Sequence, residues 1–224
     1  MKQQTLNAWP DPGTRMDAFE PGPNGAVLAA LASGDSVWVH GPAGAGKTHL
    51  AQASIAEGGG FYLSLSDAQL TPDVLDGLEQ FTRVVLDDVS AVIGVAEWER
   101  ALFALWNGCL DQGSCMWVFS AEPVADLPWV IPDLRSRAAQ LPQFALHPLD
   151  DGHLRGLLRR RADVLGLHLG DEVIAYVMRR HGRSTKQLVG LLDQIERASL
   201  RDQRVVTVPF VRQLLGERSP ADYG

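Results

Sequence analysis

The segment with the clearest chemical potential is a glycine-rich loop, Gly41–Thr48, which follows one apolar run and precedes a helical stretch. In that context backbone N–H groups and the helix N-terminus surround phosphate oxygens, while a lysine reaches the outer phosphates and a hydroxyl binds Mg²⁺. The alternative is a chance glycine-rich turn. We therefore predict a site for ADP or ATP with Mg²⁺, formed by Gly41, Pro42, Ala43, Gly44, Ala45, Gly46, Lys47 and Thr48.

A pair of carboxylates ends a second apolar run, Val84–Asp88. At the carboxyl end of a buried strand, Asp87 can hold the Mg²⁺ shell together with Thr48, and Asp88 can orient or deprotonate water. Two aspartates after an apolar run also serve as a strand exit or a helix cap. The functional interpretation therefore depends on the pairing with the phosphate-binding loop.

Basic residues farther along the chain could reach a phosphate. Arg135 and Arg137 precede the last apolar run, where they are either surface charges or an arginine finger offered to a neighbouring subunit, which leaves a homo-oligomer open. Lys186, near Arg183, lies in the first turn of a predicted helix. It is either a solvated charge or a contact for the γ-phosphate.

The elements that must position these residues alternate along residues 26–148. We expect an α/β fold with a parallel five-stranded sheet, because short apolar runs alternate with helical stretches. The predicted strands are Val37–His40, Phe61–Leu65, Val84–Asp87, Met116–Phe119 and Phe144–Leu146. The predicted crossover helices lie near 26–33, 47–57, 71–79 and 96–111.

Residues 149–216 are predicted to form a small α-helical domain, because strand signals nearly vanish after Asp150 and leucines recur at helical spacing. Ser184 followed by Gln187 fits the start of one helix. Thr207 followed by Pro209 fits the start of a last short helix. Prolines and glycines interrupt residues 1–25, which we expect to be a flexible arm, and residues 217–224 are expected to form a tail.

The composition limits the class of protein. The 224 residues carry a net charge of −7, so nucleic-acid binding would need a local basic patch. No apolar run reaches about 18 residues and no secretory leader is visible, which predicts a cytoplasmic protein that does not contact a membrane. The two cysteines, Cys109 and Cys115, exclude a disulfide framework and do not have zinc-ligand spacing.

Taken in order, these segments resemble the AAA+ superfamily, more closely its DnaA branch of replication initiators, and within that branch the Hda family of small DnaA homologues. The resemblance extends from Phe19 to Leu215. Beyond the phosphate-binding loop, it is carried by Pro72–Glu79, Ile131–Arg137, Leu192–Ser199 and Thr207–Val211. It implies an α/β AAA+ domain followed by a helical lid domain.

The resemblance also implies roles for single residues. Phe19 and Asn24 belong to the segment that lies against adenine, Arg137 matches the arginine finger, and Lys186 stands where the sensor 2 arginine is expected. The family has an aspartate as sensor 1, whereas this chain places Ala121 there. Lysine at position 186 keeps the charge but lacks the planar fork of arginine. Both departures predict weak intrinsic ATPase activity.

The implied function is regulation of replication initiation. With the DNA-loaded sliding clamp of DNA polymerase III, the chain is expected to promote hydrolysis of ATP bound to DnaA, through Arg137. Gln4 and Leu6 in the arm are expected to dock on the clamp, although a start without a partner fits equally well, and no DNA-binding domain is expected. The alternatives are a helicase-loader or clamp-loader-type ATPase and an ADP-locked adaptor.

Overall fold

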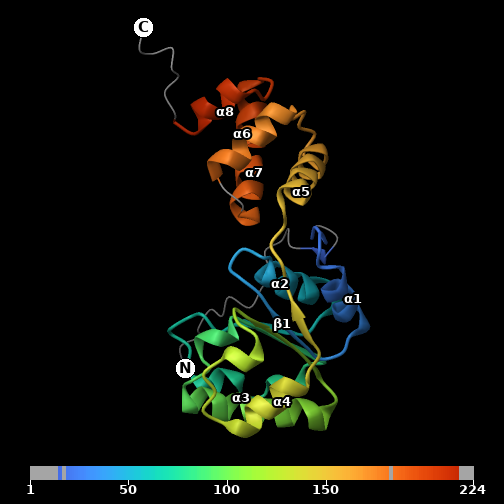
Figure 1. Cartoon of the computed structure of the whole chain (residues 1–224), viewed down its shortest axis with the longest axis vertical. Helices are drawn as coiled ribbons and strands as arrows, with labels where there is room; N and C mark the ends of the chain where they lie inside the picture. Colours follow the sequence, from blue (N-terminus) through green and yellow to red (C-terminus); the bar gives the residue numbers. More distant parts are fainter. Residues whose placement is uncertain (1–14, 17–18, 182–183, 217–224) are drawn as a thin grey trace. The chain divides into compact units, whose positions relative to one another are not determined.

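The computed structural model describes residues 15–16, 19–181 and 184–216 (Figure 1). The chain divides into two compact units, with the boundary between Pro148 and Leu149. The first unit contains all the strands of the described chain, and the second is helical. None of the helices in the described ranges is long and apolar enough to cross a membrane.

The first unit is built on a five-stranded sheet with strand order β2-β3-β4-β1-β5, in which every pairing is parallel. The strands are β1 (Val37–His40), β2 (Phe61–Ser64), β3 (Arg83–Asp87), β4 (Cys115–Ser120) and β5 (Gln143–Ala145). The predicted parallel five-stranded sheet is therefore confirmed, and no strand end differs from its predicted position by more than one residue. Because the strands are parallel, the loop after β1 and the carboxylates after β3 lie at the same edge of the sheet.

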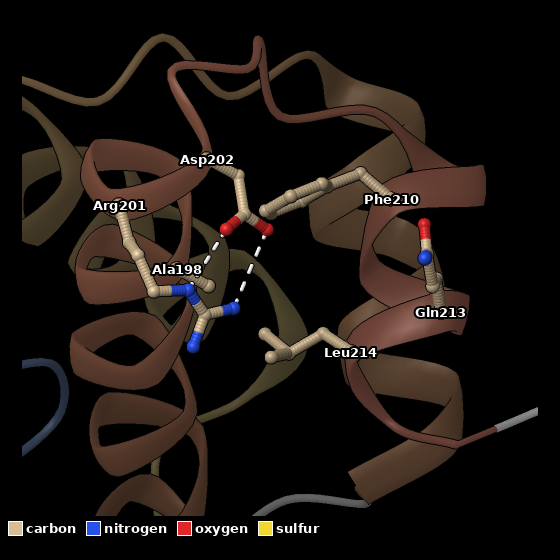
Figure 2. Close-up of a pocket in the computed structure, with 6 residues that line it drawn as sticks. All are labelled: Ala198, Arg201, Asp202, Phe210, Gln213 and Leu214. Carbon is tan, nitrogen blue, oxygen red and sulfur yellow. Dashed lines mark hydrogen bonds and ion pairs between the residues drawn. The ribbon is translucent and has the colours of Figure 1, made fainter.

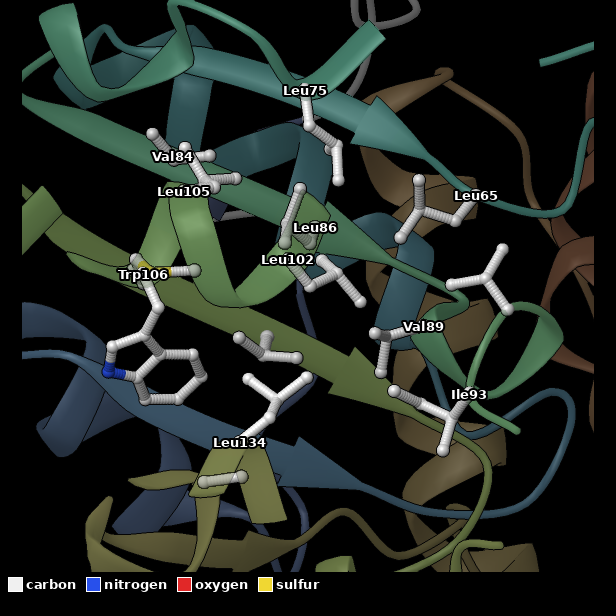
Figure 3. Close-up of a cluster of buried hydrophobic side chains, with 14 of the residues drawn as sticks. Leu65, Leu75, Val84, Leu86, Val89, Ile93, Leu102, Leu105, Trp106 and Leu134 are labelled. Carbon is white, nitrogen blue, oxygen red and sulfur yellow. The ribbon is translucent and has the colours of Figure 1, made fainter. Parts of the chain in front are cut away.

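Both faces of the sheet are covered, which explains why its strands are almost continuously apolar. Alternation along β3 sends Val84 and Leu86 into one buried cluster and Val85 into another. Helix α3 (Ala96–Gln112) and helix α4 (Pro132–Gln140) contribute to the first cluster, part of which is shown in Figure 3. Helix α1 (Gly25–Ser33) and helix α2 (Lys47–Gly58) contribute to the second, on the opposite face.

The prediction of a helix near 71–79 is wrong. The segment instead forms two short 3₁₀ helices, η2 (Pro72–Leu75) and η3 (Leu78–Gln80). Asp76 between them is extended, and Gly77 has a left-handed φ of 79°, so an α-helix cannot continue. Two further short 3₁₀ helices are η4 (Val89–Ala91) and η5 (Val124–Asp126).

Sequence reasoning also missed helix α4. This helix is only 9 residues long and is anchored by Leu134 and Ala138, which are 1% and 0% exposed. Two buried positions one turn apart are too few to establish a helical period. The miss matters because α4 carries Arg135 and Arg137.

The second unit is formed by helices α5 (Asp151–Val164), α6 (Asp171–His181), α7 (Thr185–Asp202) and α8 (Val208–Leu214). The predicted caps are confirmed: Ser184 accepts a hydrogen bond from the backbone N–H of Gln187, and Thr207 accepts one from Phe210. A surface pocket between α7 and α8 contains an Arg201–Asp202 ion pair with Nε and Oδ1 2.8 Å apart (Figure 2). The pocket is lined by Ala198, Arg201, Asp202, Phe210, Gln213 and Leu214.

Candidate nucleotide-binding site

The phosphate-binding loop connects β1 to α2. Gly44 and Gly46 have φ values of 81° and 104°, a region that side chains other than glycine rarely adopt. A Cβ atom at Gly46 would also lie 2.8 Å from Cε2 of Phe19. The glycine spacing seen in the sequence is therefore required by backbone conformation and by packing.

Lys47, the first residue of α2, is only 8% exposed. Its Nζ donates hydrogen bonds to the carbonyl oxygens of Gly41 at 2.6 Å and Pro42 at 3.1 Å. The ammonium group is thus held by two neutral carbonyl acceptors of the loop itself. Phosphate oxygens are stronger partners for this cation, so the arrangement suits an anionic ligand at the N-terminus of α2.

Asp87 ends β3 and is fully buried. Its carboxylate accepts a hydrogen bond from the Tyr62 hydroxyl at 3.2 Å, and the Thr48 hydroxyl lies near enough to lower its pKa. Burial and then the charge of Asp88 raise the pKa of Asp87, while Thr48, Tyr62 and the Asp88 backbone N–H lower it. The structure therefore brings together Thr48 and Asp87, the two residues predicted to bind Mg²⁺.

This donor pair fits Mg²⁺. The described residues contain no cluster of three His, Cys, Asp or Glu side chains that could form an all-protein metal site. Mg²⁺ in nucleotide sites is typically held by one or two carboxylates together with phosphate oxygens and water. A single buried carboxylate beside a hydroxyl, next to a phosphate-binding loop, matches that pattern.

Asp88 adopts an unusual backbone conformation, with φ 56° and ψ 36°. Its own N–H donates to Oδ1 of Asp87 at 3.0 Å, and its carboxylate accepts a 3.4 Å hydrogen bond from Ser64. Left-handed conformations of residues other than glycine are concentrated at functional sites. The turn therefore positions the second carboxylate of the predicted pair, half-buried, directly beside the first.

The segment predicted to lie against adenine is packed rather than free. Phe19 lies against Gly46 of the loop, and its ring centroid is 5.9 Å from that of His49 on α2. Asn24 is 1% exposed, and its amide donates to the His147 carbonyl and accepts from the His147 N–H, at 2.9 and 2.8 Å. The predicted flexible arm therefore ends before Asn24, whose amide is occupied by backbone and holds the segment in place.

Arg137 lies on α4, half-buried, with its guanidinium carbon 4.9 Å from the centroid of Phe103 on α3. Arg135 is exposed. Because α4 packs into the cluster on the sheet face opposite α2, Arg137 is not among the residues that surround the phosphate-binding loop of its own chain. This placement suits a contact with another subunit.

The end of β4 has no acidic side chain. Ser120 is fully buried and accepts a hydrogen bond from Trp38 Nε1 at 2.8 Å. Ala121, the predicted sensor 1 position, is exposed, and its backbone N–H donates to Ser90 Oγ at 2.9 Å. A methyl group at this position cannot hydrogen-bond water or phosphate.

Sequence reasoning missed His40, the last residue of β1 and the neighbour of the loop. Burial and the nearby His147 lower the pKa of His40, whereas Asp126 opposes the shift. His40 was visible as the only polar residue of its apolar run. Its relation to His147 and Asp126 comes from tertiary packing, which a sequence does not display.

Four of the basic and arm residues singled out in the sequence are described only in part or not at all. Lys186 falls in the first turn of α7, as predicted, but its side chain is outside the described part of the structure. Arg183, Gln4 and Leu6 are outside the described residues altogether.

Both units of the chain are similar to parts of known proteins. Residues 150–215 match the family model "Hda, lid domain". The helical second unit is therefore similar to the lid domain of Hda. Domain III of the Thermotoga maritima replication initiation protein DnaA is similar to it with a TM-score of 0.73 and 18% identity, over 92% of this chain and 97% of that one.

Two other solved structures share the fold of this chain. AMPPCP-bound DnaA from Aquifex aeolicus has a TM-score of 0.69 and 19% identity, over 87% of this chain and 70% of that one. The Thermotoga maritima RuvB Holliday junction branch migration motor has a TM-score of 0.67 and 16% identity, over 91% and 71%. At these identities the solved structures establish the AAA+ fold, and the family model adds the Hda-type lid.

Proposed function

We propose that this protein is a cytoplasmic AAA+ regulator of replication initiation that binds adenine nucleotide with Mg²⁺ and promotes hydrolysis of ATP bound to DnaA. The observation that carries the proposal is the position of Arg137, on α4, away from the phosphate-binding loop of its own chain. The Hda-type lid supports the choice of DnaA as the partner.

The residues of the chain divide into two roles in this proposal. Lys47 would contact the phosphates of the chain's own nucleotide, and Thr48 and Asp87 would hold Mg²⁺, which would neutralise charge on those phosphates. Arg137 acts on the other subunit, where its guanidinium stabilises charge on the transferring phosphoryl group. An arginine supplied in trans to a GTPase is worth about 10³–10⁵ in rate, so one residue suffices for a switch.

Low intrinsic activity supports the same division. The exposed methyl of Ala121 cannot orient water, so the chain's own nucleotide is retained rather than hydrolysed rapidly. A stably bound nucleotide would then act as part of the folded scaffold, because a ligand that binds only the folded state stabilises it.

We further propose that Gln4 and Leu6 dock on the sliding clamp as an extended peptide, which would concentrate the regulator on DNA-loaded clamps. Deleting residues 1–9 should abolish clamp binding while ADP affinity and the melting temperature stay unchanged. Equal clamp binding by truncated and full-length protein would assign the contact to a folded surface instead.

The experiment that tests the function measures phosphate release from ATP-loaded DnaA, with this protein, the clamp and DNA each omitted in turn. The proposal predicts release above the DnaA background only in the complete mixture. Sustained hydrolysis by this protein without DnaA would favour a helicase-loader or clamp-loader-type ATPase. Tight ADP retention without any effect on DnaA would favour a nucleotide-locked adaptor.

A further inference from the structure

A buried carboxylate outside the nucleotide site has no role in the function described so far. Glu99 on α3 is 0% exposed. Its carboxylate accepts hydrogen bonds from the backbone N–H groups of Gly94 at 2.8 Å, Val130 at 3.0 Å and Ile131 at 2.6 Å. Charged side chains are rarely buried unless they are fully partnered, and these donors partner both oxygens of this one.

The three donors belong to two loops that are far apart in sequence. Gly94 precedes α3, whereas Val130 and Ile131 lead directly into α4, and Ile131 is the residue that caps α4 at its N-terminus. The carboxylate therefore fixes the point at which α4 begins. It also places a negative charge near the positive end of that helix dipole.

The face of α3 that carries Glu99 also contacts Arg137. Glu99 and Phe103 are four residues apart, so they lie one above the other on α3. Glu99 binds the entry to α4, and Phe103 lies under the Arg137 guanidinium. Arg137 lies six positions after Ile131, which corresponds to a rise of about 9 Å along a helix.

We propose that Glu99 is a positioning residue for Arg137: it fixes the start of α4 and thereby the reach of the arginine toward a nucleotide bound by the partner subunit. This inference rests on the proposed function. Short helices have little rigidity of their own, because most helix stability comes from tertiary contacts. A misplacement of about 1 Å can lower a rate 100-fold, so the entry contact matters to catalysis.

The test substitutes Glu99→Gln, which keeps the shape but replaces one acceptor oxygen with an NH₂ group that faces a backbone donor. We expect the maximal rate of stimulated hydrolysis on DnaA to fall about 10- to 100-fold. The concentration that gives half of this rate, the ADP affinity and clamp binding should not change. Glu97→Gln is the matched control, because Glu97 is an exposed carboxylate on the first turn of α3.

A double-mutant cycle with Arg137→Lys separates positioning from a general loss of stability. If Glu99 acts through Arg137, the loss caused by Glu99→Gln must be several-fold smaller in the Arg137→Lys background than in the parent. Equal losses in both backgrounds overturn the inference. If Glu99→Gln does not fold, as judged by its melting transition, the cycle is run with Glu99→Asp, which keeps the charge and shortens the side chain.

The outcomes also separate this inference from the proposed function. If Arg137→Ala stimulates DnaA as well as the parent does, the proposed function itself fails. If Arg137→Ala abolishes stimulation while a folded Glu99→Gln protein matches the parent, only the positioning role of Glu99 is wrong.

Discussion

Replacing Asn24 with alanine tests whether this residue stabilises the fold or contacts adenine directly. Its buried amide donates one hydrogen bond to the His147 carbonyl and accepts one from the His147 N–H. The two residues are 123 positions apart in the sequence. Asn24→Ala removes both bonds and leaves the N–H and carbonyl of His147 to water. The structure therefore predicts a loss of stability rather than a selective loss of nucleotide binding.

The size of the effect follows from the two hydrogen bonds. A typical intramolecular hydrogen bond contributes about 0.5–1.5 kcal/mol net, and because His147 is exposed, water can reach the freed groups. The free energy of unfolding of the first unit should therefore fall by about 1–3 kcal/mol. For a unit of roughly 150 residues, a loss of 2 kcal/mol lowers the melting temperature by about 4–8 °C.

The assay is thermal unfolding with and without ADP, followed on the transition that ADP shifts, since that transition belongs to the unit that binds nucleotide. Gln112→Ala is the control, because Gln112 is an exposed amide at the end of α3 and should change stability by less than about 0.5 kcal/mol. An unchanged melting temperature together with lost ADP affinity would refute the stabilising role of Asn24 and make it a nucleotide contact.

Three further substitutions address the nucleotide site. Lys47→Ala should abolish the stabilisation that saturating ADP or ATP provides, which is about 2.7 kcal/mol at a ligand concentration of 100 times Kd. Unchanged nucleotide affinity by calorimetry would show that the loop does not bind the phosphates. Asp87→Asn should remove the Mg²⁺ dependence of ADP binding, a loss of at least about 10-fold, whereas an equal Mg²⁺ effect in both proteins would exclude Asp87 as a ligand. Because the folded state holds the pKa of His40 below its ordinary 6.5, the unfolded chain binds more protons, so stability falls as pH drops through about 6.5 toward the folded pKa. His40→Gln should flatten that part of the pH profile measured by urea unfolding, and an unaltered slope would contradict the shift.

The parts of the fold that could be predicted are those encoded locally. The phosphate-binding loop and the flanking strand are contiguous, and the middle of β3, Val84–Leu86, is apolar because both faces of the strand are buried. The caps at Ser184 and Thr207 are likewise local, since each side chain binds a backbone N–H three residues later.

The parts that could not be predicted depend on contacts between distant residues. The break at Gly77 interrupts a segment whose apolar spacing resembles a helix, and α4 is held by two buried residues and by Glu99 from another element. Asn24 resembled the end of a loose arm, yet its partner His147 is 123 positions away. Such pairings carry no period, so a sequence does not reveal them.

The central claim is that Arg137 acts on ATP held by DnaA. The most direct measurement is single-turnover hydrolysis of ATP on DnaA in the presence of DNA-loaded clamp, comparing the parent with Arg137→Ala and Arg135→Ala. Arg135, exposed on the same helix, serves as the matched control. We expect Arg137→Ala to remove the stimulation, a loss of about 10³-fold or more, and Arg135→Ala to retain most of it. Full stimulation by Arg137→Ala, with its fold and ADP binding intact, would contradict the account.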